Sequence, residues 1–306
     1  MDEIFVELTR TKARQEFKKR VGTTTQHLLT LVVGLSAVEA GAKAPSTLPA
    51  RWDPQSPVDA ARRARTFANQ ATLLWTVESL VGYVSDLRRA KPPVIAGALS
   101  EQIGSIKDKQ EKLVHLAAEM GITDSYELNL VRAAYVWRNR VTHIGARNEL
   151  NGKVAAALER DAVEIRALYQ GLDVFQVIKR IDGNEPPRLK EATAIVRAAG
   201  NLVRELDERI VRQLDQEMYL SGLLAEHVLS PETRQARMQR AVGLWGGTPK
   251  ANARSITTLA LQYGLSPSDD MCAGPELSRL NPTQALDFLD RRPDSGSGAL
   301  SSRRSG

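Results

Sequence analysis

The stretch LVRAAYVWRNRVTHI, residues 130–144, has the spacing of a helix with two different faces. At about 100° per residue, its apolar side chains recur every three or four positions and form one narrow stripe. The spacing predicts a helix over residues 124–144, started by the capping pair Asp124 and Glu127 and ended by Gly145. The stripe that we expect to face the core consists of Leu130, Ala134, Trp137, Val141 and Ile144.

Helical spacing continues over most of the chain, and no segment shows the alternation of a strand. Ala, Leu, Arg and Glu are abundant, and these residues lose little side-chain freedom in a helix. We therefore predict an all-α fold. The expected helices cover residues 24–42 (with an extension toward Ile4), 58–90, 100–120, 124–144, 151–172, 189–224, 231–244, 251–263 and 282–289.

The sequence DGNEPP, residues 182–187, breaks this helical pattern and predicts a domain boundary. Residues 1–181 are then a helical bundle that carries the RNxxxH motif described below. Residues 188–292 form a helical C-terminal region of unknown role, and residues 293–306, rich in Gly and Ser, are expected to be a disordered tail.

Composition excludes several classes of protein. The single cysteine, Cys272, rules out an internal disulfide and a thiolate-rich metal site, and it indicates a reducing compartment. The four histidines are scattered and no HExxH spacing occurs, so we expect no metal and no cofactor. The first twenty residues are too charged for a signal peptide, and the apolar stretch 28–42 is short for a membrane span and contains Glu39. We therefore expect a cytoplasmic protein without membrane contact.

The net charge of +6 is concentrated in basic clusters over residues 10–20, 62–65 and 88–91. Such clusters suit the phosphate backbone of a nucleic acid. The exposed helix faces of an Arg-rich protein give the same pattern without any such partner. Charge therefore permits a nucleic-acid partner without requiring one.

Polar side chains gather opposite the apolar stripe of residues 130–144. Asn139 lies about 180° from the stripe, with Tyr135 and His143 one turn to either side of it. Thr142 flanks these residues, and Arg138 lies on the shoulder between the two faces. We expect this face to point outward, into a groove at an interface. An exposed histidine on an ordinary helix surface is the alternative explanation.

These residue types suit the cleavage of RNA without a metal. A base must take the proton of the 2′-hydroxyl, an acid must protonate the leaving 5′-oxygen, and a cation must balance the charge on phosphate. His143 suits the first two roles, and Arg138 suits the third because its planar fork grips phosphate oxygens. Asn139 can orient either one. Because one histidine per chain cannot be both acid and base, a symmetric dimer is expected to supply the second.

RNRVTH, residues 138–143, resembles the R-x(4–6)-H motif of the HEPN superfamily, in which Asn, Asp or His commonly follows the Arg. The resemblance covers residues 20–180. It implies a helical bundle that acts as a metal-independent endoribonuclease, typically a homodimer with both motifs in one cleft. Arg138 would stabilise phosphate, Asn139 would be the polar residue after it, and His143 would transfer protons. Many members are toxins or anti-phage (abortive infection) effectors, which implies RNA, such as tRNA or mRNA, and an antitoxin or regulatory partner.

Further candidates carry less weight. Glu78, beside Trp75 on the helix over 58–90, is a weaker candidate for the same cleft, as are Tyr135 and Thr142; an exposed helix carboxylate is the ordinary alternative. The sequence LWGGTPK, residues 244–250, lacks P-loop spacing and predicts a Gly-Gly turn. The second function that the sequence allows is a non-enzymatic helical module that binds nucleic acid or another protein.

Overall fold

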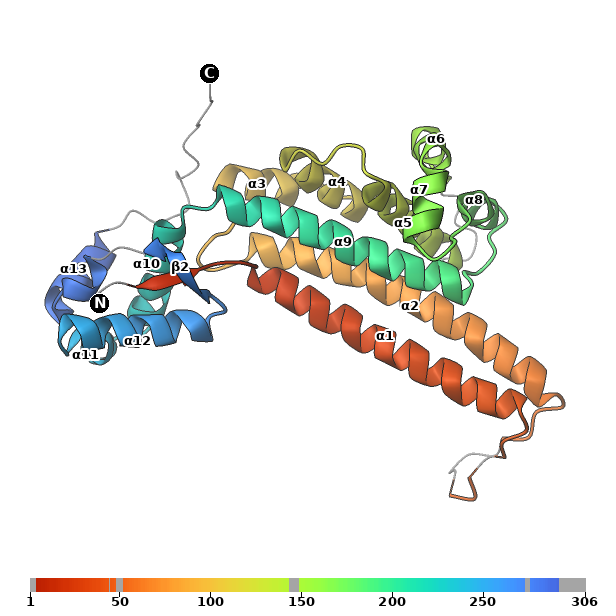
Figure 1. The fold of residues 1–306 in the computed structure, drawn as a ribbon, viewed down its shortest axis with the longest axis horizontal. Coiled ribbons are helices and arrows are strands. Elements are labelled where there is room, and N and C mark those ends of the chain that lie inside the picture. Colours follow the sequence, from red (N-terminus) through yellow and green to blue (C-terminus); the bar gives the residue numbers. More distant parts are fainter. Residues whose placement is uncertain (1–3, 44, 48–51, 143–148, 273–275, 292–306) are drawn as a thin grey trace. The chain divides into compact units, whose positions relative to one another are not determined.

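The computed structural model describes residues 4–43, 45–47, 52–142, 149–272 and 276–291. Within these residues it contains thirteen α-helices and a two-stranded sheet, which confirms the predicted all-α fold (Figure 1). Four predictions fall outside the described residues: the helix end at Gly145, the placement of His143, the core position of Ile144, and the tail over residues 293–306.

The chain folds into two compact units, and each unit is assembled from separate segments of the sequence. Unit 1 contains Met1–Gln15, Tyr83–Asp108 and Glu205–Gly306, while unit 2 contains Glu16–Gly82 and Lys109–Arg204. The predicted boundary at residues 182–187 lies inside unit 2. Helical periodicity does not show which distant helices pack together, so a segmented unit is not visible in the sequence.

Unit 2 is built from long and short helices, with the candidate strip on α5. α1 begins at Lys12 rather than at residue 24, because Thr11 caps it by accepting a hydrogen bond from the Arg14 N–H (3.2 Å). The helices wholly or partly in unit 2 are α1 (Lys12–Glu39), α2 (Pro57–Arg88), α4 (Lys109–Glu119), α5 (Tyr126–Thr142), α6 (Gly152–Arg160), α7 (Ala162–Leu168), α8 (Val174–Asp182) and α9 (Leu189–Gln213).

The start of α5 differs from the prediction by one residue. Ser125, not Asp124, accepts the hydrogen bond of a first-turn N–H, that of Leu128 (3.1 Å). The Asp124 carboxylate instead accepts from Asn129 Nδ2 (3.0 Å) and pairs with Arg160 (2.9 Å). Hydrogen bonds from Arg160 and then Asn129 lower the pKa of Asp124. The acidic residue therefore joins α5 to α6 instead of capping α5.

Glu127, the predicted partner of that cap, also has another contact. Its carboxylate accepts a hydrogen bond from the buried Tyr169 hydroxyl (3.3 Å), which in turn accepts one from Asn201 Nδ2 (3.3 Å). The Arg197 guanidinium carbon lies 5.7 Å from the centre of the Tyr169 ring. Burial raises the pKa of Tyr169 well above its ordinary value. These contacts hold the beginning of α5 against the residue after α7 and against α9.

Three predicted helices are each divided into two. The helix expected over residues 100–120 is interrupted at Ile106, whose backbone is extended (ψ 128°). The helix after Asn151 is interrupted at Asp161, although Asn151 caps its first part as predicted, through a first-turn N–H at 2.9 Å. Asp215 accepts a first-turn N–H at 2.9 Å and starts a separate helix within the predicted span 189–224. At Asp215 a side-chain cap thus overrides the continuous apolar pattern, whereas the Ile106 side chain is apolar and that of Asp161 makes no capping hydrogen bond within the described residues.

Unit 1 holds the sheet, which was not predicted. Val6 of β1 lies opposite Pro267 of β2 in an antiparallel pair, and a three-residue strand paired with a proline-containing one shows no alternation. The predicted helices over 231–244, 251–263 and 282–289 are confirmed. The elements are β1 (Phe5–Glu7), α3 (Gly97–Ser105), α10 (Gln216–Leu229), α11 (Arg234–Trp245), α12 (Pro249–Gln262), β2 (Ser266–Cys272), η1 (Leu277–Arg279) and α13 (Pro282–Asp290).

The Gly-Gly sequence forms the predicted turn between α11 and α12. Trp245 is buried and its Nε1 donates to the Leu277 carbonyl (2.7 Å), which fixes the end of α11. The Gly247 N–H donates to Asn252 Oδ1 (3.0 Å), and Thr248 caps α12. The hydrogen bonds of Trp245, Gly247 and Thr248 all serve the packing of unit 1, which supports a structural role for this turn.

A buried carboxyl group lies in unit 1 away from these helices. Asp207 is fully buried and accepts hydrogen bonds from the Thr11 backbone N–H (3.0 Å) and the Thr11 hydroxyl. Arg14 lies at 3.8 Å from the same carboxylate. Burial raises the pKa of Asp207, an effect that the Thr11 hydrogen bonds and Arg14 oppose. The Asp207 carboxyl therefore holds its proton more tightly in the native state than in the unfolded chain.

Candidate active site

The C-terminal end of α5 places Arg138 against a carboxylate of α2. Arg138 Nη2 lies 3.2 Å from Glu78 Oε1, and Lys109 Nζ lies 3.5 Å from Glu78 Oε2. The Arg138 side chain is only 11% exposed, whereas those of Glu78 and Lys109 are 35% and 52% exposed. Arg138 Nε is buried and donates to no acceptor in the described part of the chain. The structure thus brings together Arg138 and Glu78, two residues that the sequence singled out separately.

The neighbouring side chains of α5 fix its end to the segment after α8. Trp137 is fully buried and its Nε1 donates to the Glu185 carbonyl (2.8 Å). Arg140 donates to the Asp182 carbonyl (2.9 Å) and to the Ile181 carbonyl, the last acceptors of α8. Arg138 and Arg140 are two residues apart and so point to different sides of the helix, one toward α2 and one toward α8. The end of α5 is therefore held on at least two sides.

The predicted outward face of α5 is wrong for most of the helix. Tyr135 is 2% exposed, and Leu128 and Val131 on the same side are buried as well. Helices α4, α6 and α8 all contact α5, so it lies inside unit 2 rather than at its edge. A single apolar stripe shows that a helix has one buried face but does not show how many neighbours surround it. Tyr135 consequently belongs to the core and does not line an open cleft.

The remaining residues of the strip lie in the last turn. Asn139 is partly exposed, and Thr142 is exposed with its hydroxyl donating to the Arg138 carbonyl one turn earlier (2.7 Å). The Thr142 hydroxyl thus makes the ordinary backbone contact of a helix threonine. His143 lies outside the described residues, so only the sequence motif assigns it to the site.

An exposed aromatic side chain lies beside the Arg138–Glu78 pair. Trp75 precedes Glu78 by three residues on α2, which puts both on the same side of that helix. Trp75 is 60% exposed, which is unusual for so large an apolar side chain. Phe67, two turns earlier on α2, is 72% exposed. Trp75 thus offers an exposed ring on the side of α2 that carries Glu78, and a nucleic-acid base can stack on such a ring.

A second group of polar residues in unit 2 was not predicted. A pocket of about 330 Å³ lies between α2 and the segment that joins α8 to α9. Its basic lining comes partly from the cluster over residues 62–65 and partly from arginines on either side of the 182–187 break. The sequence pattern indicated only the cluster over residues 62–65. The lining residues are Arg62, Arg65, Thr66, Asn69, Arg180, Pro186, Pro187, Arg188 and Leu189.

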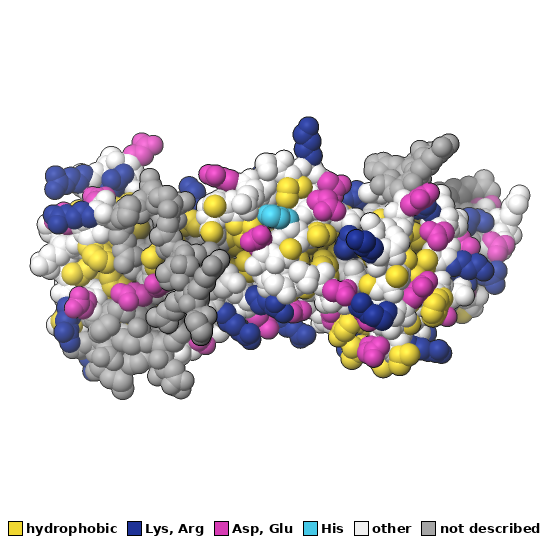
Figure 2. All heavy atoms as spheres, turned by 90° about the horizontal axis from the view of Figure 1, so that it is seen from above, with side chains coloured by type: hydrophobic (Ala, Val, Ile, Leu, Met, Phe, Trp, Pro, Cys, Tyr) yellow, Lys and Arg dark blue, Asp and Glu magenta, His cyan; other side chains and the backbone are white. Residues whose placement is uncertain are grey.

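Charge elsewhere on the surface is mixed. Figure 2 shows Lys and Arg side chains in small groups, interleaved with Asp and Glu over the face that is drawn. Among the residues that the structure describes, no three His, Cys, Asp or Glu side chains are grouped as a metal ion would require. No family model matches the chain, and the comparisons with curated proteins and with solved structures gave no match either.

Helix α1 is longer than the apolar stretch identified in the sequence. With 28 residues, Lys12–Glu39 is long and apolar enough to cross a membrane by length and composition. The stretch 28–42 is too short by the same measure, and the difference comes from the earlier start of α1. The expected cytoplasmic location stays a prediction.

Proposed function

We propose that this chain is a metal-independent endoribonuclease with its site at the C-terminal end of α5, formed by Arg138, Asn139 and His143. The observation that carries the proposal is the Arg138 guanidinium. Its Nη2 is 3.2 Å from Glu78 while its buried Nε has no acceptor among the described residues. A buried N–H without an acceptor is uncommon in proteins, and a phosphate oxygen is the acceptor that this edge of a guanidinium binds well.

In the proposed reaction the 2′-oxygen attacks the adjacent phosphorus and the 5′-oxygen leaves. His143 takes the proton of the 2′-hydroxyl, and a second histidine gives a proton to the leaving oxygen. Arg138 stabilises the charge on the phosphate oxygens, and Asn139 orients the groups around it. The products are a 2′,3′-cyclic phosphate and a 5′-hydroxyl, so no metal ion or other cofactor enters the balance.

The proposal includes a homodimer. The motif has one histidine per chain, and the partner subunit's His143 would supply the acid. Leu31, Val33 and Phe67, on α1 and α2, are between 51% and 72% exposed, and apolar side chains exposed in this way are typical of surfaces that associate. Analytical ultracentrifugation at micromolar concentration tests whether the protein is a dimer. A strictly monomeric protein that cleaves RNA would contradict the proposed homodimer.

RNA is the proposed partner, and Trp75 supports it. Its exposed indole lies on the same side of α2 as Glu78, which contacts Arg138. A base stacked on this ring would bring its own phosphate toward the guanidinium. Pools of tRNA and mRNA are the substrates to test first. On the HEPN resemblance we extend the proposal to a toxin or anti-phage effector restrained by an antitoxin or regulatory partner.

The chemistry can be tested with matched oligonucleotides in EDTA. A ribonucleotide substrate is compared with one that carries a 2′-deoxy sugar at the mapped cleavage position. We expect cleavage of the first only, with a 2′,3′-cyclic phosphate detected by mass spectrometry. Equal cleavage of both substrates, or a 3′-hydroxyl product, would show a different reaction.

One observation favours the second function, a non-enzymatic module that binds nucleic acid or protein. Arg138 is paired with Glu78 and is 11% exposed, which is also the environment of a structural arginine. Such a module would bind RNA or a protein partner and leave the RNA intact. RNA retention without any cleavage, in wild type and in His143→Ala alike, would select this function.

A further inference from the structure

We propose that the pocket between α2 and the α8–α9 segment binds a phosphate ester that also carries a hydrogen-bond donor, with a nucleoside monophosphate as the model ligand. The pocket lies within unit 2 and uses none of the residues assigned to the candidate active site. The inference therefore goes beyond the proposed function and does not depend on it.

The first observation is an unsatisfied acceptor in the pocket wall. Asn69 is 4% exposed, and its Nδ2 donates to the Pro187 carbonyl (3.2 Å). Since a carbonyl only accepts, this contact fixes the orientation of the amide. Asn69 Oδ1 is then left buried with no donor among the described residues. Buried acceptors are normally satisfied, so we expect the ligand to bring an N–H or O–H group, which reaches Oδ1 after a local shift because this atom has almost no accessible surface in the free protein.

The second observation is the charge of the lining. Arg62, Arg65, Arg180 and Arg188 line the pocket, and no acidic residue does. Four guanidinium groups around one small space favour a phosphate, whose oxygens they bind in pairs. We assign the donor required by Asn69 and the anion required by the arginines to one ligand; inorganic phosphate also carries an O–H group, and the apolar part of the wall favours a phosphate ester over it.

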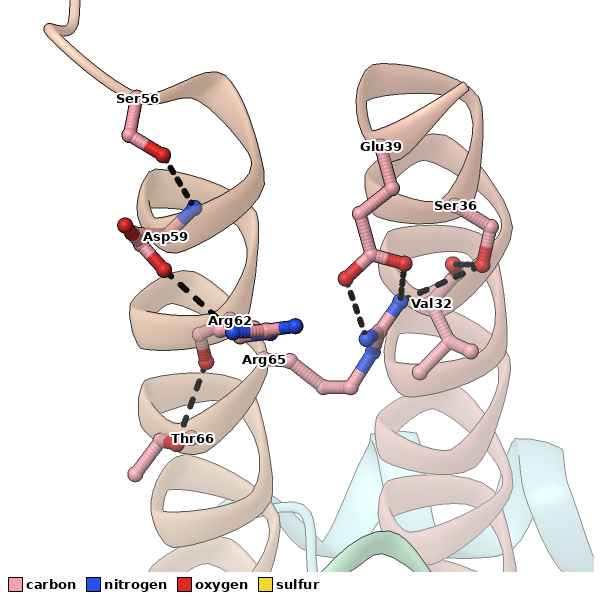
Figure 3. A network of polar contacts seen from close by, with 8 residues as sticks. All are labelled: Val32, Ser36, Glu39, Ser56, Asp59, Arg62, Arg65 and Thr66. Atoms are coloured by element: carbon pink, nitrogen blue, oxygen red, sulfur yellow. Dashed lines mark hydrogen bonds and ion pairs between the residues drawn. The ribbon is translucent and has the colours of Figure 1, made fainter.

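The arginines divide into two that are fixed and two that are available. Figure 3 shows Arg65 reaching from α2 to Glu39 of α1, with both carboxylate oxygens engaged (2.7 and 3.0 Å). The hydrogen bond to Glu39 raises the pKa of Arg65. Arg180 is held by single contacts to two carboxylates, those of Glu185 (2.8 Å) and Glu191 (3.3 Å). The charge of these two residues is largely balanced by their carboxylate partners, so they shape the wall and leave the anion to the other two arginines.

Arg62 and Arg188 are less restrained than the other two arginines. The Arg62 side chain is 70% exposed, and its contact with Asp59 is long (3.5 Å) (Figure 3). No ion pair holds the Arg188 guanidinium within the described residues, and its backbone N–H is used by Glu191 (2.7 Å). We assign the phosphate to these two side chains.

The rest of the wall is apolar and suits the remainder of such a ligand. Pro186, Pro187 and Leu189 line the side formed by the α8–α9 segment. A volume of about 330 Å³ is at the lower end for small-molecule sites, which fits one nucleotide and not two. The ribose and base would rest on the prolines while a hydroxyl or amino group reaches Asn69.

Isothermal titration calorimetry with adenosine 5′-monophosphate, adenosine and inorganic phosphate tests the proposal. We expect the nucleotide to bind at least tenfold more tightly than phosphate or adenosine. The double variant Arg62→Gln, Arg188→Gln should weaken nucleotide binding by at least tenfold. Arg63→Gln is the matched control, because Arg63 is exposed on the same turn of α2 and does not line the pocket. It should leave the affinity within twofold.

Competition then distinguishes the source of the phosphate ester. If an oligoribonucleotide displaces the nucleotide, the ligand of the pocket is one unit of an RNA chain. If it does not, the ligand is a free mononucleotide. Absence of binding to wild type, affinity for phosphate equal to that for the nucleotide, or an equal loss in Arg63→Gln would overturn the proposal. Since His143→Ala should bind the nucleotide normally, failure of this pocket and failure of the nuclease are separate results.

Discussion

The contact between Arg138 and Glu78 makes a quantitative prediction about unit 2. The two side chains are 11% and 35% exposed, so the pair lies between an exposed and a buried one. Exposed pairs contribute less than about 1 kcal/mol, while removing one partner of a buried pair costs about 3–5 kcal/mol. We therefore expect Glu78→Gln to lower the free energy of unfolding by about 1–3 kcal/mol.

The measurement is a double-mutant cycle by urea unfolding, followed by tryptophan fluorescence. Wild type, Glu78→Gln, Arg138→Gln and the double variant give the coupling energy directly. We expect a coupling of at least about 1 kcal/mol that survives high salt, because a partly buried pair is weakly screened. Lys109→Gln is the matched control: it shares the Glu78 carboxylate at 3.5 Å but is 52% exposed, so its cost should stay below about 1 kcal/mol.

Two results would refute this reasoning. A coupling energy below about 0.5 kcal/mol would show that the pair behaves as an exposed one and does not fix Arg138. A cost for Lys109→Gln equal to that for Glu78→Gln would show that general charge around the carboxylate matters, not the guanidinium contact. The same variants distinguish the residue that holds Arg138 in place from the residue that acts on the phosphate. Glu78→Gln should therefore reduce RNA cleavage less than Arg138→Gln does.

Three further predictions come from particular contacts. Trp137→Phe should destabilise the protein by about 1–3 kcal/mol in urea unfolding, because the Glu185 carbonyl loses its buried donor. Asp207→Asn should remove a pH dependence: the raised pKa of Asp207 makes its contribution to stability greatest below the ordinary value of 3.8 and smaller as pH rises through the folded pKa. Trp75→Ala should weaken RNA binding by about 1–3 kcal/mol per stacked base, as measured by fluorescence anisotropy.

Each of these has its own control. Trp52→Phe should change the free energy of unfolding little, because Trp52 is exposed, and a comparable loss there would argue against the hydrogen bond of Trp137. For Asp207, the wild-type stability minus that of Asp207→Asn should fall with increasing pH, and a rise would reverse the assigned direction. Trp75→Phe should retain most of the RNA affinity that Trp75→Ala loses, and equal losses would argue against stacking.

Helical spacing located most of the helical segments, but it did not predict where three of them are divided or how the helices are arranged. Helical spacing correctly predicted the helix at residues 251–263 and the cap at Asn151 because both depend on residues a few positions apart. The assembly of two units from separate segments depends on contacts between residues far apart in the chain. Caps such as Asp215 were missed because their neighbours continue an apolar pattern.

The candidate site shows the same limit. Arg138 and Glu78 were both singled out, yet their contact joins α2 to α5 across 60 positions, and spacing within one helix carries no information about it. Tyr135 was expected on an outward face, but it is buried. Helical spacing shows which residues share a face and does not show whether a second helix covers that face. Asn69 gave no signal at all, since an asparagine in a helix is ordinary until its acceptor is seen to be buried.

The most direct test of the central claim is cleavage of a mixed tRNA and mRNA pool in EDTA by wild type, Arg138→Ala and His143→Ala purified in parallel. The account predicts cleavage by wild type alone, with all three proteins folded to the same extent by circular dichroism. Cleavage that persists in both variants would contradict it and would place any activity elsewhere in the chain.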